Sequence, residues 1–126
     1  MSHFTTVKTE IRDAEALKSA CAELGFGFME NARARGFNGR TLKGDYVLRL
    51  KGPYDIAVSR TAGGAMALAC DWWDGHVENE AGPGYGRLLQ IYGVHKTAAE
   101  ARRKGYTVRR RALADGSVKL VIGGRR

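Results

Sequence analysis

The sequence lacks any hydrophobic run long enough to cross a membrane. Its longest apolar stretch is the alanine-rich segment Ala65–Cys70, whereas a spanning helix needs about 20 apolar residues. The first residues also lack the basic and then apolar pattern of a secretory signal. We therefore expect a cytoplasmic protein with no membrane partner.

Cysteine is scarce as well. The 126 residues include two, Cys21 and Cys70, and their separation matches neither a metal-ligand nor a redox spacing. We expect two reduced core thiols, no metal site and no cofactor. A chain of this length can bury roughly two-thirds of its unfolded surface, so we expect one domain over residues 1–126.

Acidic residues are rare in the last quarter of the sequence. Residues 95–126 hold ten Lys and Arg against Glu100 and Asp115, an excess of +8 that equals the formal charge of the whole chain. Residues 61–94 hold one basic residue against four acidic ones. Concentrated positive charge favours an anionic partner, either nucleic acid, an acidic protein or a membrane surface. The simpler alternative is a solvated face that keeps the protein soluble.

Hydrophobic periodicity predicts the elements of the first two-thirds. Residues 3–11 are rich in β-branched side chains and predict a strand. Asp13 is a candidate N-cap for a helix that Gly25 ends. The expected buried stripe of this helix consists of Leu17, Ala20, Cys21 and Leu24. Further strands are expected at residues 26–32, 45–51, 54–58 and 65–72, with a loop or weakly paired edge at 33–44.

A second helix is expected over Arg87–Lys104, after an irregular acidic connection at residues 74–86. Its expected buried stripe consists of Leu88, Ile91, Tyr92, His95, Ala98 and Ala99. The element order is β-α-β-β-β-β-α-β-β. Since no βαβ crossover repeats, we predict an α+β fold, a single two-layer domain with a mostly antiparallel sheet and both helices on one face.

The last two strands form a hairpin whose register can be argued from the sequence. A three-residue loop, Ala114–Gly116, gives one mostly apolar face and places Gly116 where a positive φ is needed. This register pairs Val108 with Ile122, Arg110 with Leu120 and Ala112 with Val118. It gathers Arg109, Arg111 and Lys119 on the opposite face. Arg110 falls on the core face, where a buried guanidinium needs a carboxylate or carbonyl groups around it. It is then either a strand-end residue whose head reaches solvent or an anchor for an acidic partner.

Several segments carry chemically active residue types without a complete site. Met1–His3 could chelate copper or nickel only if Met1 is retained. We expect instead that His3 and Phe4 begin the first strand and hold the terminus in the sheet. Asp71–Glu78 lacks calcium-loop spacing, and we expect a buried Trp72 beside a solvated acidic loop. Gly82–Arg87 leads into a helix N-terminus and could bind an anion, but it lacks the Gly-Lys-Ser/Thr sequence that ends a P-loop. It therefore predicts a nucleotide site only weakly. We expect His95 to be a hydrogen-bonded core histidine rather than a catalytic base.

Four segments occur together in an order that resembles a known family. They are MSHFTTVKTEIRD at residues 1–13, Ala34–Thr41, Gln90–Tyr106 and Ala114–Ile122. They resemble the hypothetical chloroplast reading frame thirty-five family of plastids, cyanobacteria, other bacteria and phages, over essentially the full length. That family has no known function, so the resemblance assigns no catalytic residue. Its members are often encoded beside AAA-type ATPases, which implies an accessory subunit. Gly63–Gly64, residues 74–84 and the run Arg109–Arg111 depart from the resemblance.

The leading functional expectation is a small accessory or adaptor protein that is not an enzyme. It would bind a protein partner, which the resemblance suggests is an AAA-type ATPase. The alternative is a nucleic-acid-binding module that uses the basic C-terminal face, weakened by the lack of an aromatic single-strand motif. A third reading is an enzyme or metal protein built on Asp71, Asp74, His76 and His95. The residues expected to bind an anionic partner are Arg102, Arg103, Lys104, Arg109, Arg110, Arg111 and Lys119.

Overall fold

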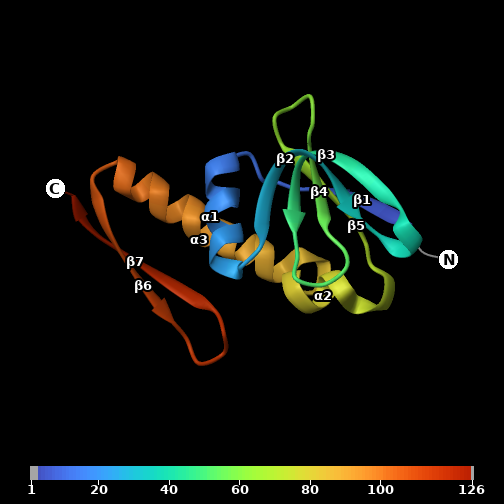
Figure 1. Ribbon diagram of the computed structural model, residues 1–126. Helices are drawn as coiled ribbons and strands as arrows, with labels where there is room; N and C mark the ends of the chain where they lie inside the picture. Colours follow the sequence, from blue (N-terminus) through green and yellow to red (C-terminus); the bar gives the residue numbers. More distant parts are fainter. Residues whose placement is uncertain (1–2, 126) are drawn as a thin grey trace.

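A five-stranded antiparallel sheet with helices on one face makes up most of the computed structural model, which describes residues 3–125 (Figure 1). Its strands are β1 (Phe4–Lys8), β2 (Gly27–Arg35), β3 (Thr41–Arg49), β4 (Ile56–Arg60) and β5 (Met66–Asp71), in the spatial order β1-β5-β4-β3-β2. The helices are α1 (Ala14–Leu24), α2 (His76–Ala81) and α3 (Gly86–Arg103). The predicted α+β class is confirmed. None of the helices in residues 3–125 is long and apolar enough to span a bilayer.

Helix α1 begins and ends where the sequence predicts. The Asp13 carboxylate accepts a hydrogen bond from the Ala16 backbone N–H at 3.1 Å, which satisfies one of the free donors of the first turn. Gly25 has a φ of 80° and its N–H returns to the Ala22 carbonyl, as a left-handed C-cap requires. Leu17, Ala20 and Cys21 are buried, whereas Leu24 is half-buried at the margin of the core.

The main core lies between the helices and one face of the sheet. Alternate residues of β3, β4 and β5 point into it, and α2 and α3 contribute apolar side chains from the other layer. The α3 members are Leu88, Ile91 and Tyr92. The side chains of Ala98 and Ala101 are also buried, whereas Ala99 is exposed and His95 is half-buried. The expectation of a core histidine at position 95 is therefore wrong.

The opposite face of the sheet carries a second, smaller apolar cluster. Its buried members are Ala34, Val47, Ala57 and Ala69, and Phe4, Met29, Ala32 and Leu42 pack against them. Of the two alternatives for residues 33–44, the loop is wrong, because this segment forms the end of the β2–β3 hairpin and pairs up to Arg35 with Thr41. The edge is correct for β2, which is the last strand of the sheet. Asn31 has a φ of 48° within β2, a left-handed conformation that interrupts the regular strand.

The connection between β5 and α3 is more regular than expected. Helix α2 and two short 3₁₀ turns, Trp73–Gly75 and Pro83–Tyr85, occupy it. One residue differs from its predicted environment here, because Trp72 is half-buried rather than buried. Asp71, at the end of β5, is fully buried, and its carboxylate accepts backbone hydrogen bonds from Phe37 and Trp73.

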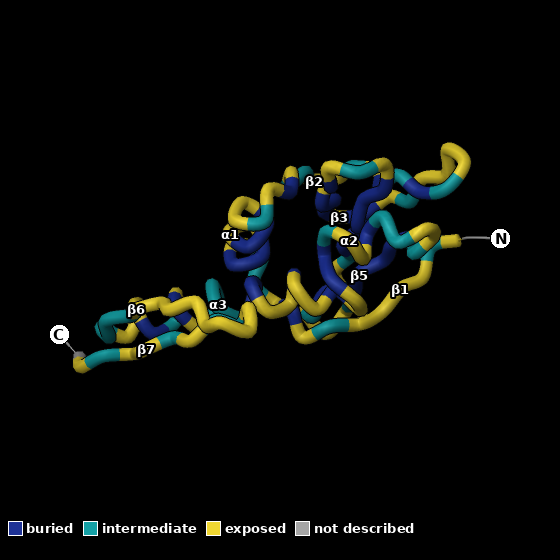
Figure 2. The backbone as a smooth tube through the Cα atoms, turned by 90° about the horizontal axis from the view of Figure 1, so that it is seen from below, coloured by how far each residue is buried: buried dark blue, intermediate teal, exposed yellow. Residues whose placement is uncertain are grey.

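Strands β6 (Tyr106–Ala112) and β7 (Val118–Arg125) form a separate two-stranded sheet. It lies beside α3 and α1, at the end of the molecule away from β1 (Figures 1 and 2). The predicted register is confirmed, with Val108 opposite Ile122, Arg110 opposite Leu120 and Ala112 opposite Val118. Gly116 has the predicted positive φ, 88°. The hairpin is much less buried than the main sheet, with Ile122 46% exposed (Figure 2).

Candidate functional site

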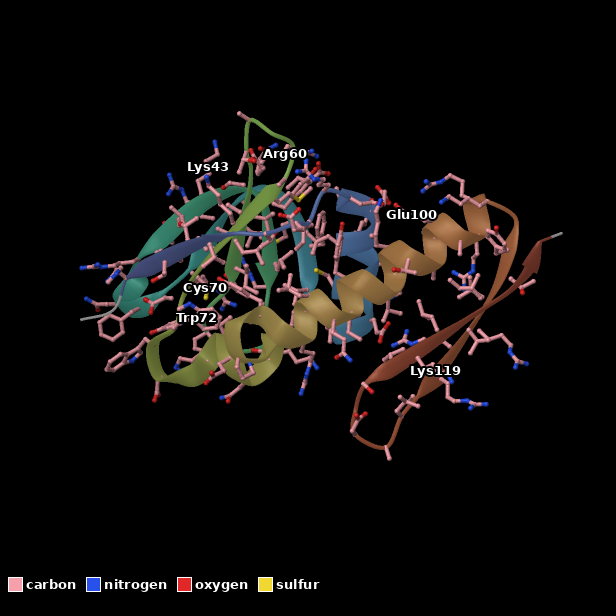
Figure 3. All side chains as sticks on the ribbon, turned by 180° about the vertical axis from the view of Figure 1, so that it is seen from behind. Lys43, Arg60, Cys70, Trp72, Glu100 and Lys119 are labelled. Carbon is pink, nitrogen blue, oxygen red and sulfur yellow. The ribbon has the colours of Figure 1, made fainter. Side chains whose placement is uncertain are left out.

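The hairpin face that points away from the helices carries three cations. Arg109 and Arg111 lie two residues apart on β6, and therefore on the same face, and Lys119 of β7 is directly opposite Arg111. All three side chains are exposed. Figure 3 shows Lys119 on the hairpin, well separated from Glu100 on α3. We call Arg109, Arg111 and Lys119 the basic face.

The basic face is not neutralised by the part of the chain that the structure describes. Within the described residues 3–125, no carboxylate forms an ion pair with any of its three cations. Val121, opposite Arg109, is 37% exposed on the same face. A shallow depression of about 220 Å³ is lined by Arg109, Arg110, Arg111 and Val121. A surface that combines free cations with an exposed apolar side chain suits an acidic partner that also offers apolar contact.

Arg110 lies on the other face of the hairpin, where it is engaged by α1. Its guanidinium donates two hydrogen bonds to the Glu23 carboxylate, at 2.7 and 2.5 Å. The hydrogen bonds from Arg110 lower the pKa of Glu23 to about 2, against the opposing effect of burial, with His95 adding to the decrease. The Arg110 side chain is 41% exposed, so its guanidinium reaches solvent, which is one of the two alternatives that the sequence leaves open. Its acidic partner is Glu23 of the same chain.

The remaining predicted cations lie at the end of α3, near the base of the hairpin. Arg102 lines a pocket of about 370 Å³ together with residues 105–108 at the start of β6. Lys104 lines a smaller pocket, of about 200 Å³, with Tyr106 and Ile122. Arg102, Arg103 and Lys104 are all exposed. The structure thus brings three of the seven predicted cations onto one face, places three at its base and pairs the seventh internally.

The residues considered for metal or enzyme chemistry are dispersed. His95 Nε2 lies 2.8 Å from Glu23, near the hairpin. Asp74 lies within η2, the Trp73–Gly75 turn, and its carboxylate is 3.8 Å from Nε2 of His76, the next residue after the turn. Residues 3–125 contain no group of three or more His, Cys, Asp or Glu side chains placed to hold a metal ion. The structure therefore does not assemble Asp71, Asp74, His76 and His95 into one site.

Two other segments were candidates for ion binding in the sequence, the N-terminus and Gly82–Arg87. Strand β1 begins at Phe4 rather than His3, and Phe4 packs into the second cluster. Met1 and Ser2, which the copper or nickel chelate would need, lie outside the described residues. The segment Gly82–Arg87 leads into α3 through Tyr85, whose φ is 65°.

Sequence reasoning missed two carboxylates that organise this fold. Glu23 carries no local signal for its role, because its partners His95 and Arg110 lie 72 and 87 positions away. Asp55 is fully buried and accepts from the Arg35 guanidinium at 2.7 and 2.8 Å. It also accepts from the Leu50 backbone N–H. In the sequence, Asp55 is marked only as an acidic residue at the start of an apolar strand, which is a weak indication that it is buried.

Comparison with known proteins gives one match. The family model described as "Protein of unknown function (DUF1257)" matches residues 20–121. No curated protein and no solved structure matches the chain.

Proposed function

The chain belongs to the DUF1257 family of proteins of unknown function, and from that premise we propose that it is an accessory protein that acts by binding a protein partner. It has no catalytic activity of its own in this proposal. Its contact surface is the basic face, Arg109, Arg111 and Lys119, and its partner presents an acidic surface. Buried free thiols at Cys21 and Cys70 suit a reducing compartment such as the cytoplasm.

The observation that supports this proposal is the separate position of the hairpin. An isolated two-stranded sheet is marginally stable in water unless another layer covers it. Helices α1 and α3 cover only the inner face of β6 and β7, while three cations and Val121 remain exposed on the outer face. A projecting element with unneutralised charge and incomplete cover is typical of a surface that a partner completes.

The identity of the partner is the finer part of the proposal. The four segments that resemble the plastid reading frame thirty-five family suggest an AAA-type ATPase, and we propose such a protein as the first to test. Arg110 takes no part in this contact, because Glu23 already holds its guanidinium. Arg102, Arg103 and Lys104 extend the positive surface toward the base of the hairpin.

Nucleic acid is the second candidate partner, and the shape of the hairpin favours it. The major groove of DNA admits a two-stranded β-ribbon, and the exposed cations of the basic face could contact phosphates. In this alternative the affinity falls steeply with salt, with a log–log slope of about −0.9 per phosphate contacted on a duplex.

One triple variant separates the two candidates. Arg109→Ser, Arg111→Ser and Lys119→Ser remove the basic face. A matched control, Arg33→Ser, Arg40→Ser and Lys43→Ser, removes two exposed arginines and one exposed lysine on β2, β3 and their connecting loop. The two triple variants therefore have the same net charge.

The experiment has two arms. In the first, affinity capture from the native host is followed by binding measurements on the purified partner. We expect the wild type and the control to bind, and the basic-face variant to associate more slowly. In the second arm, fluorescence anisotropy measures binding to a 20-base-pair duplex and to single-stranded RNA at ~0.15 M salt. Sub-micromolar binding there, lost only in the basic-face variant, would make nucleic acid the partner. Equal behaviour of both triple variants in both arms would reject the basic face as a contact surface.

A further inference from the structure

Strand β1 lies at the end of the molecule opposite the hairpin (Figures 1 and 2), and no described residue pairs with its outer edge. Strand β1 is the last in the sheet order and pairs with β5 alone among the described residues 3–125. Its sequence, Phe-Thr-Thr-Val-Lys, is typical of a strand. Four of its five residues are exposed, including Val7, which is 41% exposed. An edge of this kind offers free backbone donors and acceptors to an added strand.

A groove runs beside this edge. One pocket of about 500 Å³ lies between residues 7–11 and the start of α3, where Leu89 and Tyr92 line it. A second pocket, of about 400 Å³, continues past Trp72 and Glu78. The two pockets share Val7, Gly84 and Tyr85, so they adjoin each other. Together we call them the β1 groove.

The floor of the β1 groove is held in place before any ligand arrives. Tyr85 is 1% exposed, and its ring packs against Trp72 with centroids 4.7 Å apart. The Tyr92 hydroxyl accepts hydrogen bonds from the backbone N–H groups of Arg12 and Asp13, each at 3.2 Å. A rigid groove loses little conformational entropy on binding. Leu89 in turn is 36% exposed on its wall, leaving apolar surface to be covered.

Two of the three charged residues along the β1 groove are acidic. Lys8 and Glu10 line the first pocket and Glu78 lines the second, an excess of one negative charge. Neither glutamate forms an ion pair within residues 3–125. Two unpaired carboxylates along one groove complement an occupant that carries positive charge.

We propose that the β1 groove binds an extended peptide segment of a partner protein, with apolar side chains at alternate positions and flanking Lys or Arg. The segment adds to the sheet as a sixth strand, hydrogen-bonded to β1. Its alternate apolar side chains contact Val7 and Leu89, and its cations face Glu10 and Glu78. Backbone pairing supplies affinity and side-chain pockets supply specificity in this mode of recognition. The site is independent of the basic face and would give the protein two binding surfaces at opposite ends.

Three synthetic peptides probe this site by fluorescence anisotropy with the full-length protein. The first is fluorescein-labelled Lys-Val-Thr-Val-Thr-Val-Lys. The second has Glu in place of both Lys residues. The third is N-methylated at alternate residues, so that its backbone cannot donate N–H hydrogen bonds along one edge. We expect the first peptide to bind at least about tenfold more tightly than the other two. Equal binding of all three would overturn the proposal.

Protein variants locate the binding. The double variant Val7→Thr and Leu89→Ser should weaken binding of the first peptide by about tenfold. The double variant Glu10→Gln and Glu78→Gln should bind the first peptide, flanked by Lys, and the second, flanked by Glu, with more similar affinities than the wild type does. The control is Leu113→Ser, since Leu113 is also 41% exposed but lies on the hairpin. The basic-face variant should bind the peptide as the wild type does, which separates this site from the proposed function.

A second copy of the chain is the competing occupant. Sedimentation velocity without peptide distinguishes it from a partner peptide. We expect a monomer at the concentrations used for anisotropy. A dimer that dissociates in the Val7→Thr and Leu89→Ser variant would overturn the proposal, because the groove would then be a self-association surface. Unchanged peptide affinity in that variant, with its circular dichroism spectrum intact, would overturn it as well.

Discussion

Arg110 on β6 and Glu23 on α1 are joined by two hydrogen bonds of 2.7 and 2.5 Å. The same carboxylate lies 2.8 Å from His95 Nε2 on α3. Glu23 thus links three elements that are distant in the sequence, and it holds the inner face of the hairpin against the helices. Among the described residues, the hairpin shares no backbone pairing with the five-stranded sheet, so this side-chain contact helps to fix the orientation of the basic face.

The first prediction concerns this attachment. Arg110→Met and Glu23→Gln should each increase amide hydrogen exchange in β6 and β7, while exchange in β3, β4 and β5 stays unchanged. A double-mutant cycle should give a coupling of about 1 kcal/mol or less, because both side chains are partly solvated. Arg109→Met is the control, since Arg109 lies on the outer face. Equal exchange in the hairpin of all three variants would show that Arg110 does not hold it.

The second prediction is a pH dependence. Glu23 has its pKa lowered from 4.5 to about 2, chiefly by Arg110. A carboxylate with a depressed pKa stabilises the folded state above its unfolded pKa and loses that contribution as the pH falls. The wild type should therefore lose more stability than Glu23→Gln between about pH 4.5 and pH 2. Chemical denaturation at intervals across this range measures the difference. Parallel pH profiles for the two proteins would contradict the assignment.

Local chemistry explains why parts of this fold could be predicted from the sequence. Asp13 and Gly25 delimit α1 because capping depends on a few neighbouring residues. The β6–β7 register follows from one turn glycine and a two-residue alternation. The basic face was predicted for the same reason, since Arg109 and Arg111 must share a side of their strand.

The features that escaped prediction depend on contacts between distant segments. Residues 33–44 look polar and rich in glycine, yet Ala34 and Leu42 pack into a cluster completed by β4 and β5. Arg110 lies on the apolar face of the hairpin, as the register predicts, but the register alone does not decide whether its guanidinium is buried or reaches solvent. The helices leave that face partly open, and Glu23 determines the position of the guanidinium. Asp55 is buried through Arg35, which lies 20 positions away.

The third prediction tests the N-cap of α1. Asp13 accepts from the Ala16 N–H, which is the main cause of its lowered pKa, and it also contacts Lys96 Nζ at 3.1 Å. Asp13→Ala removes both contacts and should cost about 1–2 kcal/mol. Asp13→Asn keeps a capping oxygen and loses the charge, so it should cost less. Urea denaturation of both variants provides the comparison. If both variants lose the same free energy of unfolding, then the contact with Lys96, rather than the N-cap, accounts for the stabilisation by Asp13.

The fourth prediction tests the packing of α1 on the sheet. Leu17 is fully buried in the main core, so Leu17→Asp would place an unpaired carboxylate there. The loss should be several kcal/mol, enough to unfold much of a domain that is stable by about 5–15 kcal/mol. The adjacent Lys18 is exposed, and Lys18→Asp should leave the melting temperature within a few degrees of the wild type. A folded Leu17→Asp protein would remove α1 from the core.

The last prediction tests the close approach of strands at Gly44. This glycine lies inside β3, opposite Ala32. A Cβ atom added there would lie 2.6 Å from the Tyr46 carbonyl oxygen, and 3.0 Å from both the N and the O of Val58. All three neighbours are backbone atoms, which cannot rotate away as the end of a side chain can.

Gly44→Ala should therefore displace β3 from β4 and cost about 3 kcal/mol, at the upper end of the usual range for overpacking. Gly63→Ala is the matched control. Nothing lies within 4 Å of a Cβ at Gly63, so that substitution should leave stability unchanged within about 1 kcal/mol or raise it slightly. Thermal denaturation of the two variants measures both. If Gly44→Ala and Gly63→Ala have the same melting temperature, then β3 and β4 are not in such close contact at Gly44.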